Sequence, residues 1–459
     1  MNLNELTIIQ ALHGLKNKEF SSQELVGSCL NRIKKLNPTL NAFITICEKE
    51  PSGYPLLGIP IGVKDIYCTK GIKTTAGSNV LANYTPVYDA TVVERLKKAG
   101  AVIMGKTNLD AWAHGSSGEN SDFGATKNPW NLKFVPGGSS SGSAAAIAAD
   151  MVLMATGTDT GGSIRLPASF CNVVGLKPTY GLVSRYGVVA MASSLDTMGY
   201  FTKDVSDSAF ILSIIAGKDP LDSTTLPKPV PDYLKNLKMG IKNLKIGIPK
   251  EYFIKGIDKK IAEQIKLALK ILEKLGAKLI EVSLPHTQYA MAAYYIIQPA
   301  EVSSNLARYD GIRFGFSRTE FGDEAKRRIM LGTYVLSSGY YEAYYLKAMK
   351  VRTLIKKDFD SAFKKVDVLV APVSPTLPFK LGEKTEDPLK MYLSDIFTVT
   401  ANLAGIPGLA IPAGFVKSST ASLPVGIQIL GPQFSEELLF QVGYAFEQTT
   451  NWHKIKPKL

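Results

Sequence analysis

The chain has 459 residues, of which 45% are hydrophobic and 20% charged, a balance typical of a globular protein. It contains no uncharged apolar run of about 18 residues, so we expect no membrane-spanning helix. The net charge of +13 is spread along the chain. No aromatic-rich basic motif accompanies it, which leaves direct nucleic-acid binding as a weaker hypothesis.

The N-terminus and the cysteines indicate a cytoplasmic protein. The first residues carry neither a basic stretch nor an apolar core of the kind found in targeting peptides. The four cysteines form no C-x-x-C pair, so they indicate neither a zinc ribbon nor a redox motif. We expect them to be free thiols, as is usual in a reducing compartment.

Helices and strands alternate along the first part of the chain. The first 40 or so residues predict two helices, the second beginning with a capping box of Ser21 and Glu24. We expect Asp89 to cap a helix over 90–98 that Gly100 ends, followed by a buried strand over 101–106. The same order recurs over 261–276 and 277–284, which predicts an α/β fold with a mostly parallel, twisted sheet.

The remaining elements extend this pattern. Further strands are predicted over 151–155, 244–249, 366–371, 409–412 and 425–430, and Ser435 is expected to cap a last helix. Residues 289–365, rich in Tyr and Arg, predict a helical layer over one end of the sheet. We expect one domain, 1–459, made of N-terminal helices (1–45), a catalytic core (56–225) and a helical layer with the C-terminal half of the sheet (240–459). The proline-rich stretch 226–233 is expected to connect the last two parts.

Three short motifs contain the candidate catalytic residues. Gly62-Val63-Lys64-Asp65 follows an apolar stretch, a Gly/Ser run covers 136–144, and a second Gly-rich run covers 157–165. Gly/Ser runs are most often linkers, but these two flank a predicted helix and strand, which favours the wall of an active site. A phosphate-binding loop is disfavoured because neither G-x-x-x-x-G-K-[ST] nor a G-x-G-x-x-G after a strand is present.

The catalyst is expected to be a serine activated by a lysine. None of the four histidines lies in a G-x-S-x-G context, which argues against a Ser-His-Asp triad. Burial disfavours the charged form of a lysine and lowers its pKa from about 10.4, so a buried Lys64 could act as a base. Most lysines are solvated, and that interpretation of Lys64 stays open. Glycines before Ser163 would let main-chain amides face an oxyanion, although an ordinary turn is the alternative.

The three motifs resemble those of the amidase signature family, which has a Lys in G-V-K-D, a Ser in G-G-S-S-x-G and a nucleophile in G-x-D-T-G-G-S-[IV]-R. The spacing of the two serines also fits. The resemblance implies that Lys64 is the base, Ser139 the bridging serine after a cis Gly138 bond, and Ser163 the nucleophile. It implies an oxyanion hole formed by the amides of Thr160, Gly161, Gly162 and Ser163, and no metal. The implied fold is a central mixed, mostly parallel twisted sheet covered by helices on both faces.

A narrower resemblance is to the amidase subunits of the glutamyl-tRNA(Gln)/aspartyl-tRNA(Asn) amidotransferases. It rests on Lys326 to Thr333, Gly339 to Tyr345 and Ser394 to Thr398. It implies that Arg328 binds the α-carboxylate of glutamine and Asp395 its α-ammonium, roles that suit a guanidinium and a carboxylate. The alternative for either residue is a helix-surface or interhelical ion pair.

The implied function is that of a glutaminase subunit in a heterotrimer. Glutamine would be hydrolysed through a serine acyl-enzyme, and the ammonia would convert Glu-tRNA(Gln) or Asp-tRNA(Asn) to the amide form. The implied partners are the tRNA-binding B subunit and the small C subunit of such an enzyme. This chain would hold no cofactor, with ATP and Mg in the partner. A stand-alone amidase acting on a small amide is the alternative, and a catalytically silent scaffold a weaker one. Trp112, His114, Ser141 and Leu166 depart from the family's usual residues, which bears on the shape of the pocket.

Overall fold

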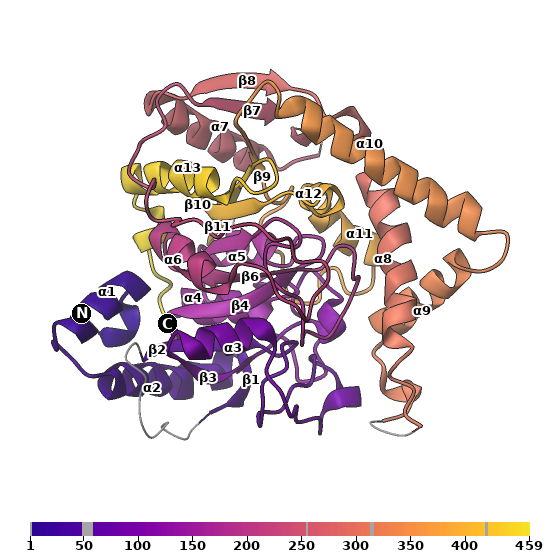
Figure 1. Ribbon diagram of the computed structural model, residues 1–459, viewed down its shortest axis with the longest axis horizontal. Helices are drawn as coiled ribbons and strands as arrows, with labels where there is room; N and C mark the ends of the chain where they lie inside the picture. Colours follow the sequence, from indigo (N-terminus) through magenta and orange to yellow (C-terminus); the bar gives the residue numbers. More distant parts are fainter. Residues whose placement is uncertain (1, 48–57, 254–255, 313–315, 418–420) are drawn as a thin grey trace.

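The computed structural model describes residues 2–47, 58–253, 256–312, 316–417 and 421–459 (Figure 1). The expected boundary between the N-terminal helices and the core lies largely outside these residues. Every strand they form belongs to one 11-stranded sheet, in the order β1-β3-β2-β4-β6-β5-β10-β11-β9-β7-β8. The strands are β1 (Phe43–Ile46), β2 (Ile59–Lys64), β3 (Ala101–Thr107), β4 (Met154–Asp159), β5 (Val174–Lys177), β6 (Thr197–Thr202), β7 (Lys245–Pro249), β8 (Lys278–Val282), β9 (Val368–Pro372), β10 (Gly408–Lys417) and β11 (Ser422–Leu430).

The sheet is mixed, as expected, but not mostly parallel. Parallel pairing occurs in two wings, β3-β2-β4 and β9-β7-β8, whereas the other pairings of the described strands are antiparallel. The wings contain the helix-and-strand units that the sequence predicts. In such a unit the helix carries the chain back across the sheet, so that the next strand runs parallel to the previous one. Only four residues separate β10 from β11, too few for a crossover, so the centre of the sheet is antiparallel.

Helices flank the sheet (Figure 1). They are α1 (Ile8–Lys16), α2 (Ser22–Leu40), α3 (Thr91–Lys98), α4 (Ser141–Ala148), α5 (Arg165–Cys171), α6 (Val205–Ile215), α7 (Lys259–Lys274), α8 (Ala290–Leu306), α9 (Asp323–Val335), α10 (Lys347–Ala362), α11 (Pro388–Tyr392), α12 (Val399–Ala404) and α13 (Glu436–Thr449). The expected helical layer over 289–365 is formed by α8, α9 and α10 (Figure 1). Among the described residues, no helix has the length and apolar character needed to cross a membrane.

Two local predictions need correction. Asp89 does not cap α3: its carboxylate accepts from the amide of Lys70 at 2.8 Å and from the ammonium of Lys97. Ser435 does precede α13, but its hydroxyl donates to the carbonyl of Pro432 at 2.7 Å instead of capping the helix. The capping box of Ser21 and Glu24 is confirmed.

The register of β4 places the candidate loops at one edge of the sheet. This strand begins at Met154, three residues later than predicted, and runs on to Asp159. Because β2 and β4 are parallel neighbours, Lys64 and Asp159 both lie at their carboxyl ends. The run 136–140 leads into α4 beside them, and Ser163 lies between β4 and α5. Three segments far apart in the sequence therefore meet at this edge.

Candidate active site

Lys64 ends β2 in a pocket of hydroxyl groups. Its side chain is fully buried, and its Nζ donates to Oγ of Ser139 and of Ser140 at 2.9 Å and to Oγ1 of Thr158 at 2.8 Å. A hydroxyl can either accept or donate, so this surrounding satisfies an ammonium with three protons and also an amine with two protons and one lone pair.

Burial sets the protonation state of Lys64. Removal from water lowers the pKa of this ammonium to about 7, against the attraction of the Asp110, Asp159 and Asp196 carboxylates. Lys64 forms no salt bridge with any described residue, so no neighbouring carboxylate fixes its charge. The neutral amine is therefore well populated at neutral pH, as a general base requires.

Ser139 and Ser163 lie on two loops that contact one another. The peptide bond between Gly138 and Ser139 is cis, as the family resemblance implies. The amide of Ser140 donates to the carbonyl of Ser163 at 3.3 Å, which ties the two loops together. Ser163 is 8% exposed, and its hydroxyl has no hydrogen-bond partner among the described residues. The expected contact between the two serine hydroxyls therefore stays a prediction.

Asp159 fixes the loop that carries Ser163. Its Oδ2 accepts from the amides of Ile164 and Arg165 at 3.2 and 3.3 Å, and Arg165 forms a buried salt bridge with its Oδ1 at 3.0 Å. Burial alone would raise the pKa of Asp159, but Arg165 lowers it to about 2. A permanently ionised carboxylate thus holds the first turn of α5 and the residues just before it.

The expected oxyanion loop leaves its main-chain donors free. No amide of residues 160–163 donates to a described residue. The Thr160 hydroxyl donates to Asp196 at 2.7 Å, and the Gly161 carbonyl accepts from Thr398 at 2.6 Å, so the loop is fixed through its other polar groups. Gly162 has a φ of 140°, and a Cβ there would collide with the Thr398 side chain. Unpaired amides on a fixed loop are what stabilisation of an oxyanion needs.

Arg328 lies on the inner face of α9 and is 4% exposed. Its Nε donates to Glu324 at 2.8 Å, and its guanidinium lies 5.5 Å from the ring centroids of both Tyr295 and Tyr392. The two terminal nitrogens of the guanidinium have no hydrogen-bond partner among the described residues. They form the fork that binds a carboxylate bidentately.

Asp395 has a free oxygen of its own. Its Oδ2 accepts from the hydroxyl of Ser116 at 2.7 Å and from that of Tyr295 at 3.3 Å, whereas its Oδ1 has no partner among the described residues. Burial raises the pKa of Asp395 to about 7, while the Ser116 hydroxyl and the charge of Arg328 lower it. A bound cation would favour the ionised form.

Thr398 and α8 connect Arg328 and Asp395 to the loop that contains Ser163. The Thr398 hydroxyl donates to the carbonyl of Gly161 at 2.6 Å and lies 3.0 Å from that of Asp395. On α8, Tyr294 packs against Gly161, and the next residue, Tyr295, contacts both Asp395 and Arg328. The predicted nucleophile and the predicted substrate-binding residues therefore belong to one continuous site.

The chain matches a family described as Amidase over residues 24–440. The chain belongs to the amidase family. It is 55% identical to the A subunit of the glutamyl-tRNA(Gln) amidotransferase of Carboxydothermus hydrogenoformans, with 100% of both chains covered. The protein of the same name in Geobacter metallireducens is 53% identical over 99% of each chain. A crystal structure of the corresponding protein from Thermotoga maritima superposes with a TM-score of 0.87 at 45% identity, covering 98% of this chain and 96% of that one. The amidase fold is thus confirmed, and the chain is an enzyme of the amidase and amidotransferase class.

The prediction from the sequence does not name every residue that builds the site. Thr158, Ser140 and Thr398 contact the predicted residues directly, and so do Ser116 and Tyr295. Thr158 and Ser140 lie within the motifs, so their position in the sequence could have identified them. Tyr295 lies on a helix with no motif of its own. No group of three or more His, Cys, Asp or Glu residues is arranged to hold a metal ion in the described part of the chain.

Trp112 and His114, which depart from the family's usual residues, are both buried. The ring nitrogens of both side chains lack hydrogen-bond partners among the described residues. Trp112 and Ala113 adopt the left-handed conformation, with φ of 59° and 63°. Burial lowers the pKa of His114 well below its usual range, helped by the charge of Arg328, so this imidazole is neutral. His114 therefore lies within electrostatic reach of Arg328 without carrying a charge of its own.

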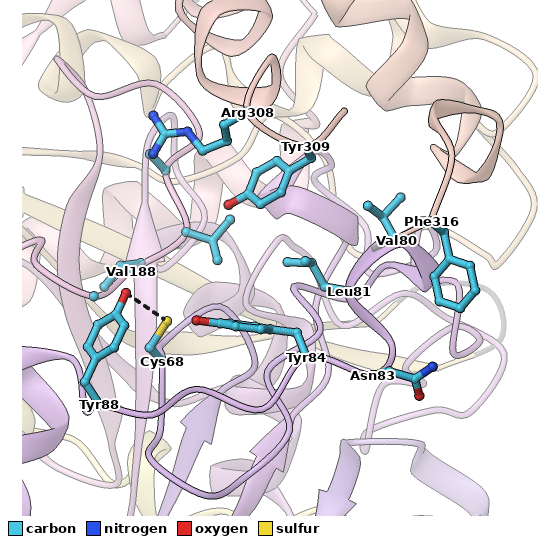
Figure 2. A pocket seen from close by; sticks show the side chains of 13 residues that line it. Cys68, Val80, Leu81, Asn83, Tyr84, Tyr88, Val188, Arg308, Tyr309 and Phe316 are labelled. Atoms are coloured by element: carbon cyan, nitrogen blue, oxygen red, sulfur yellow. Dashed lines mark hydrogen bonds between the residues drawn. The ribbon is translucent and has the colours of Figure 1, made fainter. Parts of the chain in front are cut away.

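A cavity of about 730 Å³ is lined by residues from other segments of the chain (Figure 2). Its wall includes Tyr84, Tyr88, Arg308 and Tyr309, and none of the residues predicted to act on or bind substrate. In Figure 2 the Tyr88 hydroxyl faces Cys68, whose thiol donates to it at 3.7 Å. Tyr309 also packs on Trp112, with ring centroids 4.9 Å apart. The wall of the cavity is thus connected, through Tyr309, to the segment that contains Trp112.

Proposed function

We propose that this chain is the glutaminase subunit of a tRNA-dependent amidotransferase. The observation that carries the proposal is the pair Arg328 and Asp395, which keep unpaired polar atoms beside the Ser163 loop. Their charges complement the α-carboxylate and α-ammonium of free glutamine. The relatives named as the A subunit of the glutamyl-tRNA(Gln) amidotransferase support the same function.

In the proposed reaction, Ser163 attacks the side-chain amide carbon of glutamine. Neutral Lys64 receives a proton from Ser139 while Ser139 receives the proton of Ser163. The amides of Thr160, Gly161, Gly162 and Ser163 stabilise the oxyanion, and the same relay returns the proton to the nitrogen, which leaves as ammonia. Water then attacks the glutamyl ester with Lys64 as base, which releases glutamate and restores the Ser163 hydroxyl. The hydroxyl contacts of Lys64 and its lowered pKa support these roles.

The proposal extends to partners and location. The ammonia would pass to the tRNA-binding B subunit, which is assembled with the small C subunit. The B subunit would activate the misacylated carboxylate of Glu-tRNA(Gln) or Asp-tRNA(Asn). ATP and Mg would be bound there and not in this chain. Aminoacyl-tRNA would contact mainly the partner, in the cytoplasm. The names of the relatives support an assembly of this kind.

The test compares two nitrogen sources in the assembled complex. With the partner subunits, ATP, Mg and Glu-tRNA(Gln), the wild type should form Gln-tRNA(Gln) from either glutamine or ammonium chloride. The Ser163→Ala variant should lose the glutamine-driven reaction and keep the ammonium-driven one, because only ammonia release depends on the nucleophile. If the wild-type chain cleaves a simple aliphatic amide but ignores glutamine even with its partners, the chain is a stand-alone amidase.

A further inference from the structure

The outer edge of the helical layer exposes an unusual concentration of apolar side chains. Seven of the 24 large hydrophobic residues that are exposed in the described chain lie between Met330 and Leu346. They occupy the second half of α9, the residue Tyr340 that follows it in the connecting turn, and a π-helical turn, Tyr341–Leu346, that leads into α10. In Figure 1 the connection between α9 and α10 projects away from the sheet. We call the exposed side chains of residues 330–346 the tyrosine surface, because four of the seven are tyrosines.

The tyrosine surface is ordered by its own contacts. The ring centroid of Tyr340 lies 4.3 Å from that of Tyr334 and 5.8 Å from that of Tyr344, so three rings form one cluster across the turn. Beneath them, Gly332 allows the backbone of α9 to lie against the carbonyl of Pro299 in α8. A rigid, exposed aromatic cluster loses little side-chain entropy on binding, which is typical of the central residues of a protein interface.

The composition favours a protein over RNA. Met330 is 72% exposed and Leu331 lies beside it. Aliphatic side chains gain from contact with an apolar protein surface, whereas RNA binding relies on stacking and phosphate contacts. Exposed apolar groups in a contiguous patch commonly mark a protein interface.

The charges around the tyrosine surface define the partner further. Lys326, Lys347 and Lys350 are exposed beside it and form no salt bridge with a described residue, and Glu342 is the one charged residue within 330–346. A second copy of this chain, which carries a net charge of +13, would bring the same lysines together and be repelled. A partner with carboxylates around an apolar centre would complement them.

We propose that the tyrosine surface is the docking site for an acidic face of the protein partner of this enzyme. The inference rests on the proposed function, which supplies that partner. The outer face of α9 binds it, while the inner face of the same helix holds Arg328. Docking would therefore occur on the outer face of α9, opposite the face that contributes Arg328 to the proposed glutamine site.

The experiment measures assembly with the purified partner subunits by calorimetry or analytical ultracentrifugation. Tyr334→Ala combined with Tyr344→Ala should weaken binding at least about 100-fold, because central aromatic residues dominate interface energies. Met330→Lys, which places a charge in the apolar centre, should also weaken it. Tyr289→Ala is the matched control, since Tyr289 is 51% exposed and Tyr334 is 50% exposed, but Tyr289 lies outside the tyrosine surface. The variants should keep the melting temperature of the wild type.

Three outcomes would overturn the inference. If the wild-type complex carries out glutamine-dependent amidation and the double variant binds the partners as tightly, the docking site is elsewhere and the proposed function still holds. If the variants weaken tRNA binding but not the assembly of the complex, the surface binds RNA. If the free wild type is a dimer that the variants dissociate, it binds a second copy. A wild type that neither assembles nor amidates refutes the proposed function itself.

Discussion

Arg328 and Asp395 lie against the same tyrosine without forming an ion pair. The guanidinium of Arg328 lies 5.5 Å from the ring centroid of Tyr295, whose hydroxyl donates to Asp395 at 3.3 Å. Arg328 pairs instead with Glu324 at 2.8 Å. Arg328 thus forms an ion pair within α9, as the alternative interpretation expects of it, but its terminal nitrogens and Oδ1 of Asp395 have no partner among the described residues and stay available for a ligand.

This arrangement predicts that loss of Arg328 is selective for glutamine. Loss of one desolvated charged contact costs about 2–5 kcal/mol, so Arg328→Ala should lower kcat/KM for glutamine by about 30-fold to 5000-fold. A simple aliphatic amide has no α-carboxylate, and its hydrolysis should hardly change. The measurement is a parallel assay of both substrates in both proteins.

Arg327→Ala is the matched control for this assay. Arg327 also pairs with Glu324 but is 40% exposed, so its loss should leave both substrates nearly unaffected. An equal effect of Arg328→Ala on the two substrates would assign Arg328 to the structure of α9 rather than to glutamine binding.

The pH dependence should differ between the two substrates. Lys64 must be neutral to act as a base, and its pKa is lowered to about 7, so kcat/KM for a simple amide should fall as the pH drops below that value. Asp395 must be ionised to bind an ammonium, and its pKa is raised to about 7. Hydrolysis of glutamine therefore requires that both Lys64 and Asp395 are deprotonated.

The expected profile at acid pH has a slope of about one for the simple amide and about two for glutamine in a plot of log kcat/KM against pH. Asp395→Asn should reduce activity on glutamine and leave the profile of the simple amide unchanged. Identical slopes for the two substrates in the wild type would show that Asp395 does not titrate in substrate binding.

The sequence predicts the catalytic half of this site better than the substrate half. Lys64, Ser139 and Ser163 each follow a recognisable local pattern, and two of their segments leave parallel neighbouring strands, so their meeting could be expected. Thr398 belongs to the run Ser394 to Thr398 that supports the narrower resemblance, but Tyr295 lies on a helix with no pattern of its own. Only the packing of α8 against residues 161 and 395 reveals the role of Tyr295.

The sheet was predicted correctly where its units are local. Helix-and-strand repeats give the two parallel wings, whereas the antiparallel centre depends on the pairing of β5 with β10, which lie more than 200 residues apart in the sequence. Asp89 likewise shows that contacts which the sequence does not reveal can override a local pattern. Its position before α3 is suitable for capping, but Lys97 and the Lys70 amide engage its carboxylate instead.

Gly162→Ala tests the geometry of the oxyanion loop. The added Cβ would collide with Thr398, and a φ of 140° disfavours any side chain, so the free amides should be displaced. Loss of one oxyanion donor typically costs about 10²–10³ in kcat, and a loss of that order is expected for both substrates.

Gly240→Ala provides the comparison for Gly162→Ala. Gly240 also has a positive φ, of 72°, but a Cβ there would meet nothing within 4 Å. Its substitution should lower the melting temperature slightly and leave kcat unchanged. If the two substitutions lower kcat equally, the effect comes from general destabilisation and not from the loop.

The last prediction concerns whether Lys64 and Ser163 act as one unit. Lys64 Nζ lies 2.9 Å from Ser139 Oγ, and in the proposed relay this serine transfers the proton of Ser163. Removal of any member of such a relay abolishes the same step, so the effects of single substitutions do not add. Lys64→Ala and Ser163→Ala should each abolish ammonia release, and the double variant should be no less active than either.

Ser213→Ala is the control, because Ser213 donates only to the carbonyl of Ala209 on α6. Residual rates should be measured at high enzyme concentration together with thermal unfolding. A double variant clearly slower than both singles would show that Lys64 acts independently of Ser163, and the proton relay would have to be abandoned.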